Sequence, residues 1–232
     1  MTSATPELHT ATNNFTPARR HQNSFVAASE KRLLVWMAHH TPGGINSDHL
    51  TALGFIAQCL AGACYVLARW NSYALLLGIF FLALNWLGDS LDGTLARIRN
   101  RQRPRYGFYV DHISDSIAAL FLMGGLALSP FVHPAIAGGM LLGFFLLSIE
   151  SYLATYTLGT FRLSYWKFGP TEIRVLLALG NLALLKHSVV KVRGAEFLLF
   201  DIGGMIAIAG MAAMFSVTVL QHICKLYQEE MV

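Results

Sequence analysis

The sequence has few charged residues. Asp, Glu, Lys and Arg make up 13% of its 232 residues, against roughly 25% in an average soluble domain, while 54% of the residues are hydrophobic. A water-soluble fold of this size cannot hide so much apolar surface. Several apolar runs approach the roughly 20 residues that a helix needs to cross a bilayer. The composition therefore predicts an all-α integral membrane protein.

Cysteine is also scarce, and the amino-terminal segment lacks the apolar core of a secretory signal. Cys59, Cys64 and Cys224 have spacings that fit neither a zinc site nor a redox pair, so we interpret them as small apolar side chains. We expect residues 1–23 to form a disordered polar tail. Residues 24–41 mix apolar and charged side chains at helical spacing, which predicts a juxtamembrane amphipathic helix along the membrane surface.

Six apolar segments follow the break at Pro42, and we predict that residues 45–232 form one domain of six transmembrane helices. The predicted spans are residues 50–68, 73–96, 107–128, 133–157, 170–187 and 197–222. Six crossings return both termini to one side, and 13 of the 17 Lys and Arg residues fall on that side. Because basic residues favour the cytoplasmic face, we predict that this side is cytoplasmic, in the plasma (inner) membrane if the protein is bacterial.

Four aspartates lie inside the predicted spans, where a charge costs at least ~2–3 kcal/mol on insertion scales. Asp89 and Asp92 are three residues apart, and Asp111 and Asp115 are four apart, so each pair shares a helix face. Consecutive antiparallel helices would bring the two pairs to one depth, where four carboxylates repel one another unless cations are present. Oxygen ligands suit hard ions, so the pattern predicts a site for divalent metal, with two ions balancing four charges.

Small and basic residues lie between the two aspartate pairs. Gly93 and Ala96 allow a bulky ligand to approach the helix, and the Arg97 guanidinium is suited to phosphate oxygens. Metal, small residues and a guanidinium together predict a diphosphate site. The alternatives are that single aspartates make structural hydrogen bonds, or that all four line an ion pathway.

Eight of these residues form one string with fixed spacing. They are Asp89, Asp92, Gly93, Ala96, Arg97, Gly107, Asp111 and Asp115. With this string the chain resembles the CDP-alcohol phosphotransferase family, and every fixed position of the family's signature is filled. The resemblance implies a six-helix membrane enzyme, a homodimer, that transfers a phosphoalcohol from a CDP-linked donor to an acceptor hydroxyl and releases CMP.

The resemblance also implies roles for each position. The implied ligands of Mg²⁺ or Mn²⁺ are Asp89, Asp92, Asp111 and Asp115. The implied contacts of the cytidine diphosphate are Gly93, Ala96, Arg97 and Gly107. Asp115 is the implied general base. Many relatives carry a Pro-Asn pair where this chain has Ser47-Asp48, so no nucleotide contact is transferred to that position, and Asp48 is interpreted as a candidate helix cap.

The sequence does not identify the acceptor. The candidate acceptor-binding residues are Arg162, Lys167, Glu172 and Arg174, which flank Gly169-Pro170 between the fourth and fifth predicted spans. The other interpretation is an ordinary basic cytoplasmic loop. The compact length favours a CDP-diacylglycerol donor, whereas the pair Asp111-His112 and the segment from Gly169 to Glu172 resemble enzymes that use CDP-choline or CDP-ethanolamine.

Two other classes of protein use acidic residues in membrane helices. A membrane prenyltransferase would place its second acidic motif much farther along the chain, whereas both pairs here fall between residues 89 and 115. A cation carrier would place its acids near the membrane midplane, whereas these lie near one surface and close to Arg97. The predicted partners are the lipid bilayer, the donor and the acceptor, with no nucleic acid.

Overall fold

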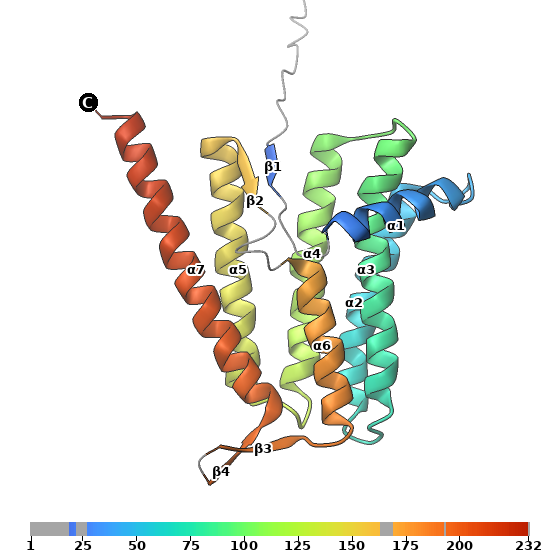
Figure 1. Cartoon of the computed structure of the whole chain (residues 1–232), viewed down its shortest axis with the longest axis vertical. Helices are drawn as coiled ribbons and strands as arrows, with labels where there is room; N and C mark the ends of the chain where they lie inside the picture. Colours follow the sequence, from blue (N-terminus) through green and yellow to red (C-terminus); the bar gives the residue numbers. More distant parts are fainter. Residues whose placement is uncertain (1–18, 22–26, 163–168, 193, 232) are drawn as a thin grey trace, which may run out of the picture.

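The computed structural model describes residues 19–21, 27–162, 169–192 and 194–231, and most of these residues are helical (Figure 1). The helices are α1 (Ala27–His40), α2 (Ser47–Leu67), α3 (Ala74–Ile98), α4 (Pro104–Ala127), α5 (Pro134–Leu158), α6 (Pro170–Leu184) and α7 (Leu199–Glu229). The strands are β1 (Arg19–His21) parallel to β2 (Thr160–Arg162), and β3 (Val189–Val192) antiparallel to β4 (Ala195–Leu198). The chain therefore has the helical architecture of a membrane protein.

Five of the described helices are long and apolar enough to cross a bilayer: α2, α3, α4, α5 and α7. Their bounds match five predicted spans, with α7 continuing to Glu229 beyond the predicted end at residue 222. The sixth, α6, has 15 residues. At 1.5 Å per residue it spans ~22 Å, less than the roughly 30 Å of a hydrocarbon core. A full set of six spans therefore stays a prediction.

Helix α6 begins partway along the length of the bundle and not at its end. In Figure 1 it starts partway along α4 and ends at the end of the bundle where β3 follows. Its start is specified locally, because Pro170 occupies the first helical turn and the backbone N–H of Gly169 donates to Glu172 Oε2 at 2.9 Å. The first turns of α6, which include Glu172 and Arg174, therefore lie beside the middle of the neighbouring helices and not at the end of the bundle.

Helix α2 packs closely against both α3 and α4 at glycines. A Cβ added to Gly88 of α3 would lie 2.5 Å from the Leu50 carbonyl oxygen of α2. A Cβ added to Gly125 of α4 would lie 2.0 Å from the Gly62 carbonyl oxygen. Such close approach of backbones is typical of membrane helices, whose association depends on packing and not on a hydrophobic driving force.

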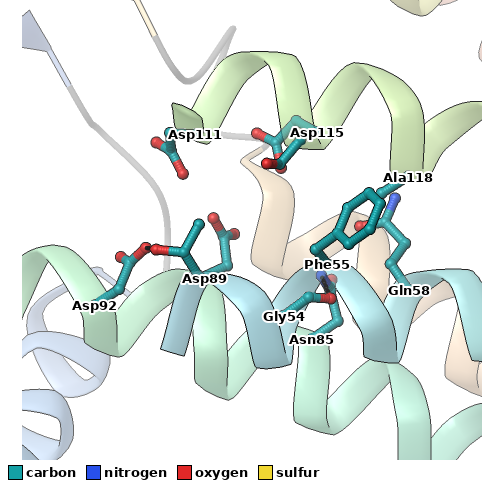
Figure 2. A pocket seen from close by; sticks show the side chains of 11 residues that line it. Gly54, Phe55, Gln58, Asn85, Asp89, Asp92, Asp111, Asp115 and Ala118 are labelled. Carbon is teal, nitrogen blue, oxygen red and sulfur yellow. Dashed lines mark hydrogen bonds between the residues drawn. The ribbon is translucent and has the colours of Figure 1, made fainter. Parts of the chain in front are cut away.

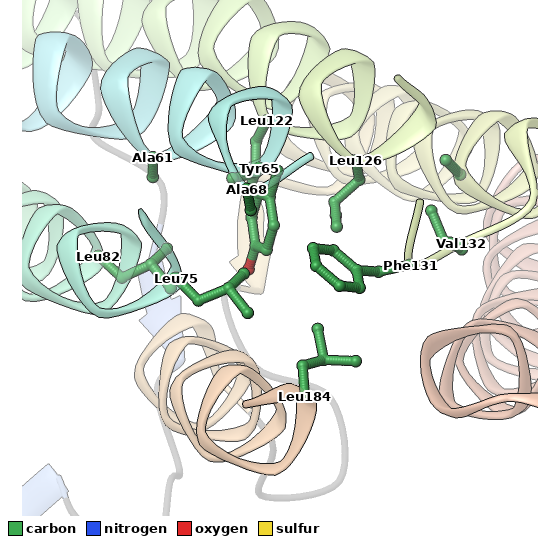
Figure 3. Close-up of a cluster of buried hydrophobic side chains, with 11 residues drawn as sticks. Ala61, Tyr65, Ala68, Leu75, Leu82, Leu122, Leu126, Phe131, Val132 and Leu184 are labelled. Atoms are coloured by element: carbon green, nitrogen blue, oxygen red, sulfur yellow. The ribbon is translucent and has the colours of Figure 1, made fainter. Parts of the chain in front are cut away.

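A buried apolar cluster fills the end of the bundle at the carboxyl end of α2 (Figure 3). It includes Tyr65, Leu75, Leu126 and Phe131, and it joins α2 to α3, α4 and the loop before α5. The Tyr65 hydroxyl donates to Asn181 Oδ1 of α6 at 2.9 Å, so this end of the cluster also holds α6. A buried hydroxyl with a partner avoids the desolvation penalty of an unmade hydrogen bond.

Helix α7 packs mainly on α5. Near one end, His222 Nδ1 lies 2.5 Å from Oε1 of the buried Glu150. Near the other end, the backbone N–H of His133 donates to Asp201 Oδ1 at 2.7 Å. The two polar contacts hold α5 and α7 together as a pair at the edge of the bundle (Figure 1).

Helix α1 lies within the predicted amphipathic segment at residues 24–41 and crosses α3 (Figure 1). Leu34 and Ala38 are buried in a cluster with Leu91 and Leu95 of α3, while Trp36 is exposed. Its location on a membrane surface stays a prediction. Of the predicted tail, residues 1–23, only Arg19–His21 are among the described residues, where they form β1.

The contact between Gly62 and Gly125 can be tested with a neighbouring glycine as control. Gly125→Ala should lower the thermal unfolding midpoint of the purified protein in detergent, because overpacking costs about 1–3 kcal/mol. Gly124→Ala should not, since no atom lies within 4 Å of an added Cβ there. Equal midpoints for the two variants would contradict the close approach of α2 and α4.

Candidate functional site

Three aspartates from two helices meet at one point (Figure 2). Asp89 of α3 and Asp111 and Asp115 of α4 each offer a carboxylate oxygen, and these oxygens lie within 4.8 Å of one another. In Figure 2 the side chains of Asp111 and Asp115 point from α4 toward Asp89. The half-buried group brings together acids from both predicted pairs.

The fourth aspartate, Asp92, lines the same pocket but is held differently. Its carboxylate accepts a hydrogen bond from Thr51 Oγ1 of α2 at 2.7 Å and another from the backbone N–H of Gly93. Ser47 of α2 also donates to the Asp92 carbonyl oxygen at 3.1 Å. Asp92 therefore connects the site to the first turns of α2, and its predicted role as a metal ligand stays a prediction.

An arginine enters the aspartate group from α6. The Arg174 guanidinium lies 2.6 Å from Asp89 Oδ2, and its Nε donates to Asn85 Oδ1 at 2.6 Å. Asn85 in turn donates from Nδ2 to the Gly54 carbonyl oxygen at 2.9 Å. A chain of hydrogen bonds thus runs from the backbone of α2 through Asn85 and Arg174 to Asp89.

Helix α2 supplies one wall of the pocket that contains the aspartates. The lining residues are Thr51, Gly54, Phe55, Gln58, Asn85, Asp89, Asp92, Asp111, Ser114, Asp115 and Ala118. The α2 members were missed in the sequence because none is charged. Their spacing, at positions 51, 54, 55 and 58, is that of one helix face and includes the only two polar side chains between residues 50 and 64.

The residues predicted to contact cytidine diphosphate lie at the ends of α3 and α4 that are nearer to the aspartates. Arg97 is exposed, and its guanidinium donates to Thr94 Oγ1 at 3.0 Å. A Cβ added to Gly93 would meet this guanidinium at 3.5 Å, and one added to Gly107 would meet no atom within 4 Å. The arrangement leaves space beside a cation, and the contact roles stay predictions.

Asp48 does not cap α2, so that interpretation is wrong. Helix α2 begins at Ser47, which places Asn46 at the cap position. Asp48 lies in the first turn and forms an exposed ion pair with Arg103, just before α4. The hydrogen bond from Arg103 to this carboxylate raises the pKa of the guanidinium above its ordinary value. The pair joins the starts of α2 and α4.

The four candidate acceptor residues have different positions. Arg174 lies in the aspartate group, and Glu172 caps the start of α6 through the Gly169 N–H. The side chain of Arg162 and all of Lys167 lie outside the described residues. His112, next to Asp111, is buried between Phe108, with ring centroids 4.2 Å apart, and Tyr152, at 5.2 Å.

The donor set fits a divalent metal. Asp89, Asp111 and Asp115 provide only oxygen ligands, which suit hard cations such as Mg²⁺ and Mn²⁺. When the three carboxylates are ionised, the single positive charge of Arg174 leaves an excess of negative charge. Because carboxylates this close repel in a partly buried pocket, a divalent ion would stabilise the group.

Comparison with protein families gives one match relevant to this site. A family described as CDP-alcohol phosphatidyltransferase matches residues 45–221. The matched part begins just before α2 and ends within α7, so it contains every residue of the aspartate pocket and more than half of the chain. No match was found among curated proteins.

The aspartate group predicts a measurable metal site. Each of the substitutions Asp89→Asn, Asp111→Asn and Asp115→Asn should weaken Mn²⁺ binding at least about tenfold, because each removes a charged ligand worth at least ~1.4 kcal/mol. Electron paramagnetic resonance of free Mn²⁺ in titrations of the detergent-purified protein measures this affinity. Glu196→Gln, on the exposed strand β4, is the control and should leave it unchanged. Wild-type affinity in all three aspartate variants would contradict the site.

Proposed function

The chain belongs to the CDP-alcohol phosphatidyltransferase family, and we propose that it transfers a phosphatidyl group from CDP-diacylglycerol to an acceptor hydroxyl, with release of CMP. Membership of the family supports the general activity, transfer of a phosphoalcohol in phospholipid synthesis at a membrane. The observation that carries the proposal is the convergence of Asp89, Asp111 and Asp115 on one pocket, because a cation held by these acids would supply the positive charge that a diphosphate donor needs.

We propose that Asp89, Asp92, Asp111 and Asp115 hold two ions of Mg²⁺ or Mn²⁺. Bound metal of this kind neutralises the charge of the diphosphate and of the leaving phosphate. Asp89 is kept in place by Arg174, and Asp92 is oriented by Thr51, so the chain fixes two of these carboxylates in advance. Such preorganisation lowers the reorganisation that substrate binding would otherwise require.

The donor would lie between the aspartates and the exposed ends of α3 and α4. Arg97 is suited to the diphosphate, because a guanidinium can donate two parallel hydrogen bonds to phosphate oxygens. Gly93, Ala96 and Gly107 present no bulky side chain on this path. The diacylglycerol part of the donor would remain in the bilayer, which is the reason that such an enzyme must be membrane-embedded.

In the proposed reaction Asp115 acts as general base. Its carboxylate takes the proton of the acceptor hydroxyl, and the hydroxyl oxygen attacks the phosphorus that carries the diacylglycerol. A new oxygen–phosphorus bond forms as the bond between the two phosphates breaks, and CMP leaves with the electron pair. Asp115 lies farther along α4 than Asp111, and both line the pocket.

The alternative reaction joins diacylglycerol to phosphocholine or phosphoethanolamine from the corresponding CDP-alcohol. Asp111-His112 and the segment Gly169 to Glu172 resemble enzymes of that kind. His112 stacks on Tyr152 and lies edge-on to Phe108, and its Nδ1 is 3.9 Å from Asp111 Oδ2. A His112→Ala variant that keeps the wild-type rate would exclude His112 as a second base.

Two further proposals concern the assembly. We propose that the aspartate side of the bundle faces the cytoplasm, as the distribution of Lys and Arg favours. We also propose a homodimer, for which α7 offers small residues: an added Cβ on Gly203 or Gly210 meets no atom within 4 Å. Such open small-residue positions allow a second helix to approach closely.

The general-base role predicts a separation of turnover from binding. Asp115→Asn should reduce turnover at least about a thousandfold, because removal of a general base and of a nearby charge combine. Binding of the CDP-linked donor in the presence of Ca²⁺, measured by isothermal titration calorimetry, should weaken far less, since Asp89, Asp92 and Asp111 remain. A loss of donor binding as large as the loss of turnover would show that Asp115 acts through the metal site alone and not as the base.

Acceptor-dependent release of CMP tests the function itself. The purified protein is given CDP-diacylglycerol with Mg²⁺ or Mn²⁺ and a series of acceptors that includes serine, inositol phosphate and glycerol 3-phosphate. Release should require an acceptor, stop with EDTA and be absent in Asp115→Asn. Activity only with CDP-choline or CDP-ethanolamine and diacylglycerol would establish the alternative. If added CMP does not exchange into any CDP-linked donor, the result would favour a prenyltransferase or a cation carrier.

A further inference from the structure

A carboxylate of α1 joins three helices beside the aspartate pocket. Glu30 Oε1 accepts hydrogen bonds from Trp86 Nε1 of α3 at 2.7 Å, from Thr171 Oγ1 of α6 at 2.9 Å and, more weakly, from Ser90 Oγ of α3 at 3.4 Å. We refer to these four residues as the Glu30 junction. Nothing in the proposed reaction uses it.

The junction holds the parts of α3 and α6 that carry site residues. Trp86 and Ser90 belong to the turn of α3 that also contains Asp89. Thr171 lies in the first turn of α6, one turn before Arg174, whose guanidinium pairs with Asp89. One oxygen of Glu30 therefore connects the same two segments that the ion pair of Arg174 with Asp89 connects.

The electrostatics favour a carboxylate at this position. In the described part of the chain, the donors to Glu30 are neutral, so its charge is offset by hydrogen bonds and by the amino-terminal end of α6. A helix amino terminus carries a partial positive charge that stabilises a nearby anion. The bond between Thr171 and Glu30 is partly buried, so such an interaction is less screened by water than one at a fully exposed position.

The hydrogen bonds of Glu30 are not needed to attach α1 to the bundle. Leu34 and Ala38 already bury α1 against Leu91 and Leu95 of α3. By contrast, the side-chain bonds that join the first two turns of α6 to other described helices are those of Thr171 to Glu30 and of Arg174 to Asn85 and Asp89. The contribution specific to Glu30 is therefore to the start of α6.

We propose that Glu30 is a positioning residue: through Thr171 it fixes the start of α6 and so holds Arg174 against Asp89. The inference rests on the proposed function for its effect on turnover. Its structural part, the order of the start of α6, is independent of any activity. In this arrangement the surface helix α1 sets the geometry of the site without contacting the aspartates.

The test uses the full-length protein in detergent with three substitutions in the junction and one control. Glu30→Ala and Thr171→Val each break the bond to α6, and Glu30→Gln keeps an accepting Oε1. The control is Lys31→Ala, which changes the neighbouring exposed charge on α1. The measurements are hydrogen–deuterium exchange of residues 170–176, Mn²⁺ affinity, and kcat and KM for acceptor-dependent CMP release.

Glu30→Ala and Thr171→Val should each increase exchange of residues 170–176 and lower kcat about tenfold, a loss of ~1.4 kcal/mol, with a smaller change in the KM of the donor. The double variant should lose no more than Glu30→Ala alone, because that substitution already removes the bond between Glu30 and Thr171. Glu30→Gln should restore most of kcat, and Lys31→Ala should behave as wild type.

Unchanged exchange of residues 170–176 in both Glu30→Ala and Thr171→Val would overturn the inference, as would additive losses in the double variant. If Glu30→Ala does not fold, Thr171→Val and Glu30→Gln decide the question through the same exchange measurement. Failure of the proposed function would show differently: wild-type protein would release no CMP with any donor, while exchange and Mn²⁺ affinity would still report on the junction.

Discussion

The site depends on the close approach of α2 to its two neighbours. Gly88 meets the backbone of α2 near Leu50 and Gly54, and Gly125 meets it at Gly62, so side chains cannot separate the three helices. Helices α3 and α4 each pack on α2, and the described contacts between α3 and α4 themselves are few. The distance between the aspartates of α3 and those of α4 therefore depends on Gly88, next to Asp89, and on Gly125, farther along α4 than Asp115.

The second constraint is charge. Asp89, Asp111 and Asp115 lie close together at a depth where water screens poorly, and Arg174 is the cation that the chain itself brings to them. It reaches them because α6 begins at Gly169 and Pro170, partway along the bundle (Figure 1). Helix α6, which is too short to cross the hydrocarbon core by itself, thus places the Arg174 guanidinium in the aspartate group.

Sequence spacing was enough to predict the aspartate pairs, because 3.6 residues per turn determine which residues share a helix face. It also located five helices that are long and apolar enough to cross a membrane, since their length and hydropathy are local properties. It did not place Arg174 with Asp89, nor Thr51 with Asp92, because these contacts join residues far apart in the chain. Nor did it identify Glu30, whose polar partners come from helices that only the folded bundle brings together.

The pairing of α7 with α5 divides the bundle in two. The aspartate pocket is built from α2, α3 and α4, with α6 beside it, whereas α7 packs mainly on α5 through contacts such as Glu150 with His222. Tyr152 of α5 stacks on His112, next to Asp111, whereas α7 makes its main contacts with α5. Evolution can therefore change α7, and with it the outer surface of the bundle, while the residues around the aspartates stay the same.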